Sequence, residues 1–230
     1  MKNSKVSNCL NCTKRAQCFS KLISSEITFI NKNKTHLFYR KGENICKQGA
    51  FASYLLYISD GLVKIYMENP NNKNINIKIL KTTDFIGFSS VYGDNTYHYS
   101  SVALRDSSVC LIEKETFRKL LENNGAFASE IIKRYCDNEK QLFNKIQSLS
   151  NKQMHGRLAD TLLYLSNENL CKDNIFSYLS RKDIADFAGL STETTVRLIS
   201  ELKNDNIISI NGKSIEITNF EKLKEISNRG

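Results

Sequence analysis

The chain has 230 residues, 40% of them hydrophobic and 25% charged, with a formal net charge of +9. This length allows two modest domains, and the composition is that of an ordinary globular protein. No apolar run approaches the roughly 20 residues that span a bilayer, and the N-terminus has no apolar signal segment. We therefore expect a cytoplasmic protein without a membrane partner, whose seven cysteines are thiols or metal ligands rather than disulfides.

The N-terminal stretch CLNCTKRAQC places Cys9, Cys12 and Cys18 at the spacing C-x2-C-x5-C. Three thiols this close are compatible with a zinc site, an iron–sulfur site or a thiol redox switch. Basic residues exceed acidic ones by seven in residues 1–40, whereas the two balance in residues 151–230. A DNA-binding function of the C-terminal part must therefore come from locally placed residues, while the N-terminal cations are expected to lower the thiol pKa values.

Residues 34–112 consist of short apolar stretches separated by glycine, asparagine and aspartate. Period-2 alternation in NINIKIL and in Leu62–Met67 predicts antiparallel strands. Turn signals at Asp60-Gly61 and Gly93-Asp94 separate strand from strand. The pattern predicts a small barrel or roll.

From residue 126 to 150 there is no glycine or proline, and helix-forming residues dominate. The pattern predicts one long helix with an apolar seam at three- and four-residue spacing, in which Glu139 occupies one position. The seam consists of Ile132, Tyr135, Glu139, Leu142, Ile146 and Leu149. We interpret it as a dimerisation seam; the alternative is a helix packed on its own barrel. Two facing copies of Glu139 would weaken such a dimer.

The segment from residue 179 to 218 predicts a winged helix-turn-helix. Ser180 and Asp183 form a capping pair at the start of a short helix, and Gly189 provides the turn. Ser191 then caps a second helix that runs to about Lys203. The following hairpin, IISI–NG–KSIEIT, is predicted to turn through a type I′ turn at Asn-Gly.

The second of these helices carries the candidate DNA-contacting residues near its N-terminal end, because that end of a recognition helix reaches base edges. Arginine can donate two hydrogen bonds to guanine, and glutamate can accept one from cytosine. A surface ion pair between Glu193 and Arg197 is the alternative interpretation. The candidates are Ser191, Thr192, Glu193, Thr194, Val196 and Arg197.

The predicted order of elements resembles the Crp–Fnr superfamily of bacterial transcription regulators over the whole chain. This order is a barrel, a long helix with an apolar seam and a winged helix-turn-helix. The segment KDIADFAGLSTETTVRLISEL resembles its helix-turn-helix signature, and DFIG at Asp84–Gly87 resembles its effector-binding segment. The resemblance implies an α+β protein that binds double-stranded DNA as a homodimer on a palindromic operator and contacts RNA polymerase. We accordingly divide the chain into an arm (1–22), a cyclic-nucleotide-binding-like β-roll (23–125), a dimerisation helix (126–150) and a winged helix-turn-helix domain (151–230).

The effector-binding segment differs from that of the cyclic-nucleotide-binding members of the superfamily at several residues. Phe88 stands where those members carry a glutamate for the ribose, and His98-Tyr99 stands where they carry Arg-Ser for the phosphate. A cyclic nucleotide is therefore not expected. Fnr-type members instead carry an N-terminal C-x2-C-x5-C and a later cysteine, which ALRDSSVCLIEKETF places at Cys110. The resemblance thus implies a [4Fe–4S] cluster held by Cys9, Cys12, Cys18 and Cys110.

Several alternatives stay open on the sequence. The same four thiols can hold zinc, although zinc sites usually use two C-x2-C pairs, or can act as a redox switch. His98 is a candidate haem ligand in the barrel. Cys46 and Cys136 are expected to be small buried residues, and Cys171 lies in a loop.

No catalytic motif is present, so no enzymatic activity is expected and no catalytic residue is assigned. A nucleotide-binding regulatory module of a larger enzyme is disfavoured, because the chain contains no catalytic part. A DNA-architectural protein is disfavoured, because it would need a more basic C-terminal part than this one. Val196 replaces a serine of the Fnr-type reader, which changes a hydroxyl into a group suited to a thymine methyl. Glu193 and Arg197 predict a half-site centred on GA/TC.

Overall fold

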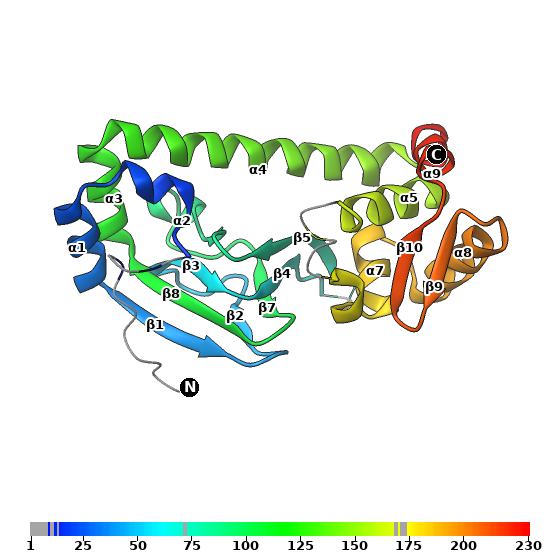
Figure 1. Cartoon of the computed structure of the whole chain (residues 1–230), viewed down its shortest axis with the longest axis horizontal. Helices are drawn as coiled ribbons and strands as arrows, with labels where there is room; N and C mark the ends of the chain where they lie inside the picture. Colours follow the sequence, from blue (N-terminus) through cyan, green and yellow to red (C-terminus); the bar gives the residue numbers. More distant parts are fainter. Residues whose placement is uncertain (1–8, 10–11, 13, 71–72, 168–169, 171–173) are drawn as a thin grey trace. The chain divides into compact units, whose positions relative to one another are not determined.

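A computed structural model describes residues 9, 12, 14–70, 73–167, 170 and 174–230 (Figure 1). The chain forms two compact units. The first comprises Met1–Glu68 and Lys78–Lys140, and the second comprises Asn69–Ile77 and Gln141–Gly230. Within the described ranges, no helix combines the length and apolar character needed to cross a membrane.

The first unit begins with the 3-10 helix η2 (Gln17–Lys21) and the helix α1 (Ser24–Lys32), and it ends with α3 (Lys114–Asn123) and the first part of α4 (Gly125–Asn151). Between α1 and α3 the chain is almost entirely β-structure, as predicted. The strands are β1 (Lys34–Tyr39), β2 (Asn44–Cys46), β3 (Tyr54–Asp60), β4 (Leu62–Met67), β5 (Ile75–Lys81), β6 (Phe85–Ile86), β7 (Ser100–Ala103) and β8 (Ser107–Glu113), with the short helix α2 (Ser89–Tyr92) before β7.

The strands form two four-stranded sheets, ordered β1-β8-β3-β6 and β2-β7-β4-β5. In the first sheet β8 pairs antiparallel with both β1 and β3. The register places Cys110 of β8 opposite His36 on one side and opposite Tyr57 on the other. Residues directly opposite each other in a sheet share one face, so these three side chains form a row across the sheet.

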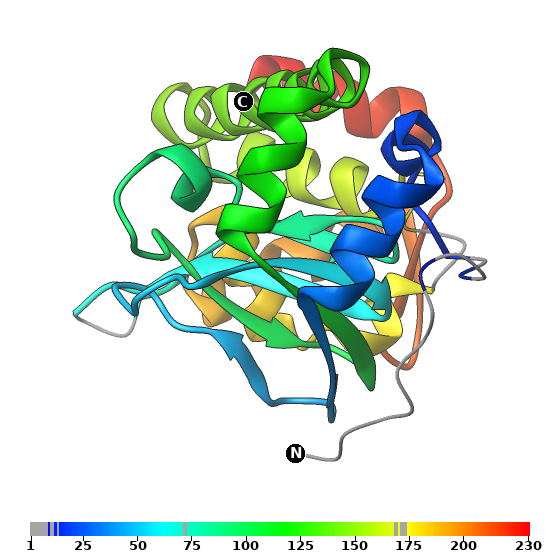
Figure 2. The same ribbon diagram turned by 90° about the vertical axis from the view of Figure 1, so that its left-hand side faces the viewer.

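Helices α1 and α3 lie side by side against the first sheet (Figures 1 and 2). Their apolar residues join the strands in one buried cluster that also receives Cys18 and Phe19 of η2 and Phe127 of α4. The sequence interpretation placed residues 23–125 in the roll and did not predict these two helices. They cover the sheet face that carries Cys110, which keeps that side chain buried.

The second unit is mainly helical. Its elements are the end of α4, then α5 (Met154–Leu165), the 3-10 helix η3 (Ile175–Tyr178), α7 (Arg181–Ala188), α8 (Thr192–Asn204), β9 (Ile208–Asn211), β10 (Ser214–Ile217) and α9 (Phe220–Arg229). Helix α9, which the sequence interpretation did not predict, packs against α5. Its Leu223 is fully buried.

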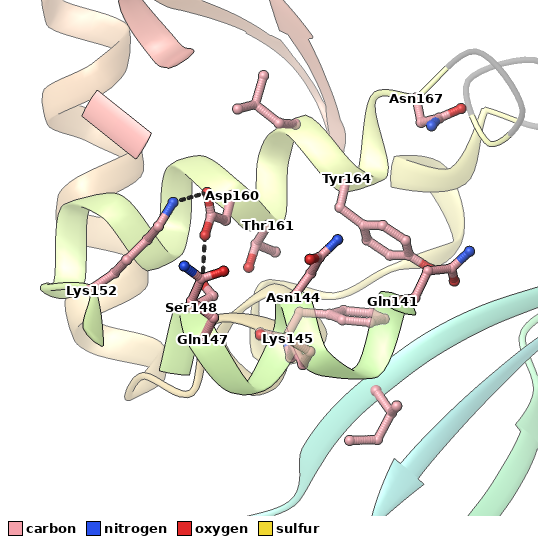
Figure 3. Close-up of a pocket in the computed structure, with 13 residues that line it drawn as sticks. Gln141, Asn144, Lys145, Gln147, Ser148, Lys152, Asp160, Thr161, Tyr164 and Asn167 are labelled. Carbon is pink, nitrogen blue, oxygen red and sulfur yellow. Dashed lines mark hydrogen bonds and ion pairs between the residues drawn. The ribbon is translucent and has the colours of Figure 1, made fainter. Parts of the chain in front are cut away.

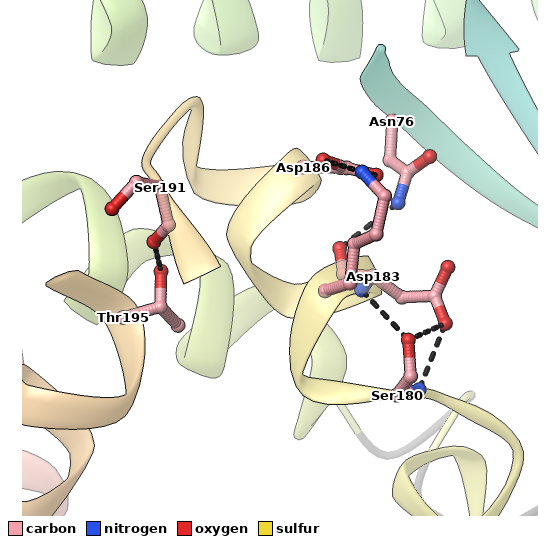
Figure 4. Close-up of polar contacts among 7 residues, drawn as sticks. Asn76, Ser180, Asp183, Asp186, Ser191 and Thr195 are labelled. Atoms are coloured by element: carbon pink, nitrogen blue, oxygen red, sulfur yellow. Dashed lines mark hydrogen bonds and ion pairs between the residues drawn. The ribbon is translucent and has the colours of Figure 1, made fainter. Parts of the chain in front are cut away.

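The predicted helix-turn-helix is present as α7 and α8. The Ser180 hydroxyl accepts a hydrogen bond from the backbone amide of Asp183 at 3.0 Å, and the Asp183 carboxylate accepts one from the amide of Ser180 at 2.8 Å (Figure 4). This reciprocal capping fixes where α7 begins. Gly189 ends it with a φ of +63°, a left-handed conformation that favours glycine, and a Cβ there would lie 2.7 Å from the Leu149 side chain.

The hairpin that follows is confirmed, but its predicted turn is wrong. Strands β9 and β10 pair Asn211 with Ser214, so the two central residues are Gly212 and Lys213 rather than Asn211 and Gly212. Only Gly212 of these has a positive φ, at +58°. A type I′ turn needs positive φ at both central residues, whereas type II′ places glycine at the first of them. The wing therefore turns through a glycine-first arrangement.

Candidate functional site

The four cysteines predicted to be ligands gather on one side of the first unit. Cys9, Cys12 and Cys110 line the same small cavity together with Tyr57, Arg15 and Lys34. Cys18 is fully buried in the cluster that also contains Cys110. The described residues contain no three His, Cys, Asp or Glu side chains close enough to hold one metal ion. Four cysteine thiolates are the donor set that an iron–sulfur cluster takes, so the residue types fit such a group.

Burial dominates the acidity of these thiols. Burial raises the pKa of Cys110 to about 11, although the nearby Lys34 acts in the opposite direction. Burial likewise raises the pKa of Cys18 against the charge of Arg134. The expectation that surrounding cations lower the thiol pKa values is therefore wrong for these two residues. Both thiols hold their protons at neutral pH, so a metal that binds them must displace two protons.

Among its described residues, the arm makes three polar contacts with the roll and α1. The Tyr57 hydroxyl donates to the Lys14 carbonyl at 2.5 Å, and the Lys14 ammonium lies 2.8 Å from the Asp60 carboxylate. The backbone amide of Cys9 donates to the Asn31 side chain at 3.1 Å. Burial raises the pKa of Tyr57 well above its usual range, so its hydroxyl keeps the proton that it donates.

The arm also contacts the beginning of α4. The Phe19 ring stacks on Phe127 of α4, with centroids 6.0 Å apart and an interplanar angle of 17°. The side-chain amide of Asn124 donates to the Lys21 carbonyl at 3.0 Å, and its oxygen accepts from the Phe127 amide at 2.9 Å. The segment that carries Cys18 therefore meets the first turn of α4 directly.

The site where cyclic-nucleotide members hold their ligand is lined differently here. Phe88 packs against Phe85 and Phe117, with ring centroids 4.9 and 6.2 Å away. His98 lies 2.8 Å from Asp94, and both side chains are more than half exposed. The buried hydroxyl of Tyr99 accepts a hydrogen bond from the Gly87 amide at 3.0 Å. Phe88 offers no carboxylate for a ribose, and His98 and Tyr99 offer no guanidinium for a phosphate.

The seam of α4 is exposed along most of its length. Ile132, Tyr135, Leu142 and Ile146 keep between 44% and 62% of their surface accessible, and Glu139 is exposed beside them. Leu149 is half-buried and packs close to Gly189. The sequence interpretation missed Phe143, which is 61% exposed next to the seam. Cys136 is exposed too, so the expectation that it is buried is wrong, whereas Cys46 is buried as expected.

Helix α8 presents its N-terminal part to solvent. The Ser191 hydroxyl accepts from the Thr194 amide at 3.1 Å. The Thr195 hydroxyl donates to the Ser191 carbonyl at 2.9 Å (Figure 4). Glu193, Val196 and Arg197 are exposed, whereas Thr192 and Thr194 are half-buried. Arg197 pairs with Glu201 at 2.6 Å, and Glu201 also lies 3.2 Å from His155. The alternative Glu193–Arg197 pair is thus not the one that forms.

Cys171, the remaining thiol, lies outside the described residues.

A cavity of about 460 Å³ opens in the second unit between the end of α4, α5 and α7 (Figure 3). Asp160 accepts hydrogen bonds there from Lys152 at 2.8 Å and from Ser148 at 2.6 Å. Lys145 donates to the Phe187 carbonyl, and burial lowers the pKa of Lys145 to about 8. The carboxylate of Asp160 is thus bonded to side chains of the cavity wall itself.

Two family models match the chain. Residues 36–124 match the cyclic nucleotide-binding domain, and residues 156–226 match the Crp-like helix-turn-helix domain. Together they cover more than half of the chain, in the order that the fold shows.

The chain is similar to two curated regulators in sequence and to one solved structure in fold. The anaerobic regulatory protein of Bacillus subtilis is 27% identical over 197 residues, 83% of each chain. The cAMP-activated global transcriptional regulator CRP of Salmonella typhimurium is 25% identical over 183 residues, which is 78% of this chain and 87% of the relative. The structure of FixK2 from Bradyrhizobium japonicum has a TM-score of 0.72 and 22% identity, and the match covers 84% of this chain and 96% of FixK2.

These relatives are transcription regulators and not enzymes, in agreement with the absence of a catalytic motif in the sequence. The roll, the helix-turn-helix, the two matched domain models and the relatives agree. The chain therefore belongs to the Crp–Fnr family and is a DNA-binding transcription regulator.

Proposed function

We propose that the protein is an Fnr-type regulator whose DNA binding depends on an oxygen-labile [4Fe–4S] cluster held by Cys9, Cys12, Cys18 and Cys110. The observation that carries this proposal is that Cys9 and Cys12 of the arm line one cavity with Cys110 of β8, about a hundred residues later in the chain. Arg15 and Lys34 line the same cavity. Their charges suit a cluster that carries two negative charges with its four thiolates.

The similarity to a cAMP-activated regulator raises a cyclic nucleotide as the competing effector. The phenylalanine packing around Phe88 and the exposed His98–Asp94 pair oppose it, because neither can replace the lost ribose and phosphate contacts. A simple thiol redox switch is opposed by the raised pKa of Cys110 and Cys18, because buried protonated thiols react slowly. The name of the Bacillus subtilis relative, an anaerobic regulator, favours control by oxygen.

When bound, the cluster supplies an oxygen-sensitive covalent link between the arm and β8. Residues of the arm and of α4 then connect this link to the proposed dimer interface. Phe19 and Asn124 connect the arm to the first turn of α4. The exposed seam of α4 is suited to bind a second copy of the chain. Apolar side chains at this spacing form a stripe along one helix face, and pairing two such stripes removes their surface from water.

In the dimer, each α8 would enter one major groove of a palindromic operator with Glu193 and Arg197 at the base edges. Arg197 must exchange its contact with Glu201 for a base, and an exposed ion pair costs little to break. Val196, which is exposed on the same helix, is suited to contact a thymine methyl. We also propose, from the family resemblance, that the DNA-bound dimer contacts RNA polymerase.

The test is to purify the protein without oxygen. We expect a brown protein with about four iron and four sulfide per chain and a broad visible absorbance that is lost in air. Binding to a GA/TC-centred palindrome should weaken over the same time course. A colourless protein with stoichiometric zinc would replace the cluster by a zinc site, and a sharp Soret band would replace it by haem.

Replacing Glu139 by leucine is expected to strengthen the dimer of the metal-free protein. Glu139 is the exposed acidic member of an otherwise apolar seam, so its two copies repel each other across the proposed interface. We expect the dimer dissociation constant to fall roughly tenfold, the effect of about 1.4 kcal/mol. Sedimentation equilibrium in air measures it. Lys140→Leu adds similar apolar area at the next position, outside the seam, and should change little; a metal-free wild-type protein that is already fully dimeric contradicts the idea.

A further inference from the structure

Tyr57 links the two parts of the chain that carry the cysteines. It lies on β3 directly opposite Cys110 of β8. Its hydroxyl donates to the backbone carbonyl of Lys14, a residue between Cys12 and Cys18, at 2.5 Å. Its ring packs edge-on against Phe19, with centroids 5.2 Å apart. One side chain therefore touches the arm by its polar tip and by its ring while it stands beside Cys110.

The side chains that tie the arm to the roll differ in their exposure. The ion pair between Lys14 and Asp60 is 2.8 Å long, but the two side chains are 50% and 41% exposed, so water and salt weaken it. The bond from the Cys9 amide to Asn31 is only half-buried. Tyr57 is 4% exposed. Its hydrogen bond is part-buried, like the Cys9–Asn31 bond, but its donor hydroxyl belongs to a side chain that the buried cluster holds in place, so losing it removes a fixed partner of the arm.

We propose that Tyr57 is a positioning residue, whose hydroxyl holds the arm so that Cys12 and Cys18 stay within reach of Cys110. This inference rests on the proposed iron–sulfur site and adds how its two halves are kept together. Without the anchor, the arm samples a larger volume, and the effective concentration of its thiols near β8 falls. The hydroxyl acts through the Lys14 carbonyl and needs no contact with the bound group.

The variant Tyr57→Phe tests this, because it removes the hydroxyl and keeps the ring that packs on Phe19. The matched control is Tyr97→Phe. Tyr97 is also a buried tyrosine of the roll whose hydroxyl donates to a backbone carbonyl, that of Tyr54, at 2.9 Å. The first readout uses the reduced, metal-free protein, and follows the alkylation of each cysteine by iodoacetamide with mass spectrometry.

We expect Cys18 to be alkylated about fivefold faster in Tyr57→Phe than in wild type, the change that loss of one ordinary buried hydrogen bond gives to a local opening equilibrium. Tyr97→Phe should leave the rate at Cys18 unchanged, and the exposed Cys136 should react equally in all three proteins. An unchanged rate at Cys18 in Tyr57→Phe overturns the proposal. Equal acceleration by both variants also overturns it, because it shows a general loosening of the roll.

The second readout is the rate at which anaerobically loaded protein loses iron to a chelator. We expect faster loss from Tyr57→Phe than from wild type and Tyr97→Phe. Equal loss from all three overturns the proposed link between the anchor and the metal site. If wild-type protein takes up no iron at all, the proposed function fails, and the alkylation rates still decide whether Tyr57 holds the arm.

Discussion

Replacing Cys110 by serine is expected to abolish the cluster and with it the oxygen-dependent part of DNA binding. The arm can offer three thiols, and Cys110 supplies the fourth from β8 in the proposed site. A serine hydroxyl is a poor ligand for iron in such a cluster. We expect iron after anaerobic purification to fall from about four per chain toward zero. Operator affinity without oxygen should fall to its value in air, roughly tenfold or more, within the usual range of coupling between two sites.

The matched control for this change is Cys46→Ser. Cys46 is also a buried cysteine of the roll, its thiol lies 3.1 Å from the Ser101 hydroxyl, and burial raises its pKa to about 11, as it does for Cys110. It is not among the residues that line the cavity with Cys9 and Cys12. We expect this variant to keep its iron and its response to air. Full iron content in Cys110→Ser would show that the fourth ligand is another group.

Replacing Arg197 by alanine is expected to weaken binding to the preferred operator by about 1–3 kcal/mol, or roughly 5- to 150-fold, and to relax discrimination at one base pair of each half-site. The Arg197 side chain is 56% exposed near the N-terminal end of α8, and its present partner is the exposed Glu201. Because that ion pair is weak, the arginine can turn to a guanine at small cost. Quantitative binding to a set of operators, each with one altered base pair, measures the effect.

Lys203→Ala is the control for charge, since Lys203 is an exposed cation at the other end of the same helix. Its loss should lower affinity only slightly and by the same factor for every sequence. If Arg197→Ala behaves in that uniform way, Arg197 contacts phosphate and does not read a base. The variant should also fold normally, because Arg197 makes no buried contact in the described structure.

Local signals predicted the second unit well. The capping pairs at Ser180 and Ser191 involve residues three positions apart, so their chemistry is visible in the sequence and fixes where α7 and α8 begin. The hairpin turn was assigned to the wrong pair of residues because turn type depends on strand register, which the sequence does not determine locally. Helix α9 was missed although Asn219 caps its start, accepting a hydrogen bond from the Lys222 amide at 3.0 Å.

The candidate cluster site depended on long-range contacts. The C-x2-C-x5-C spacing identified three thiols, but the position of Cys110 beside Tyr57 and His36 follows from the pairing of β8 with two strands distant in sequence. The effect of Lys14 and Arg15 on the thiols was overestimated because sequence proximity does not reveal burial, and burial raises the pKa of Cys18 and Cys110. Cys136 was misjudged for the converse reason, since it faces solvent on α4.

Asn124 is the N-terminal cap of α4 as well as a partner of the arm. Its side-chain oxygen accepts from the Phe127 amide at 2.9 Å and its backbone carbonyl accepts from Ala128 at 2.9 Å, while its amide group binds the Lys21 carbonyl. An arm that withdraws removes one of the bonds that orient this cap, and a lost cap destabilises a helix by about 0.5–2 kcal/mol. Because the same amide group also donates to the Glu26 carboxylate at 3.0 Å, departure of the arm would loosen this cap without removing it, and the weakening would fall on the first turn of α4.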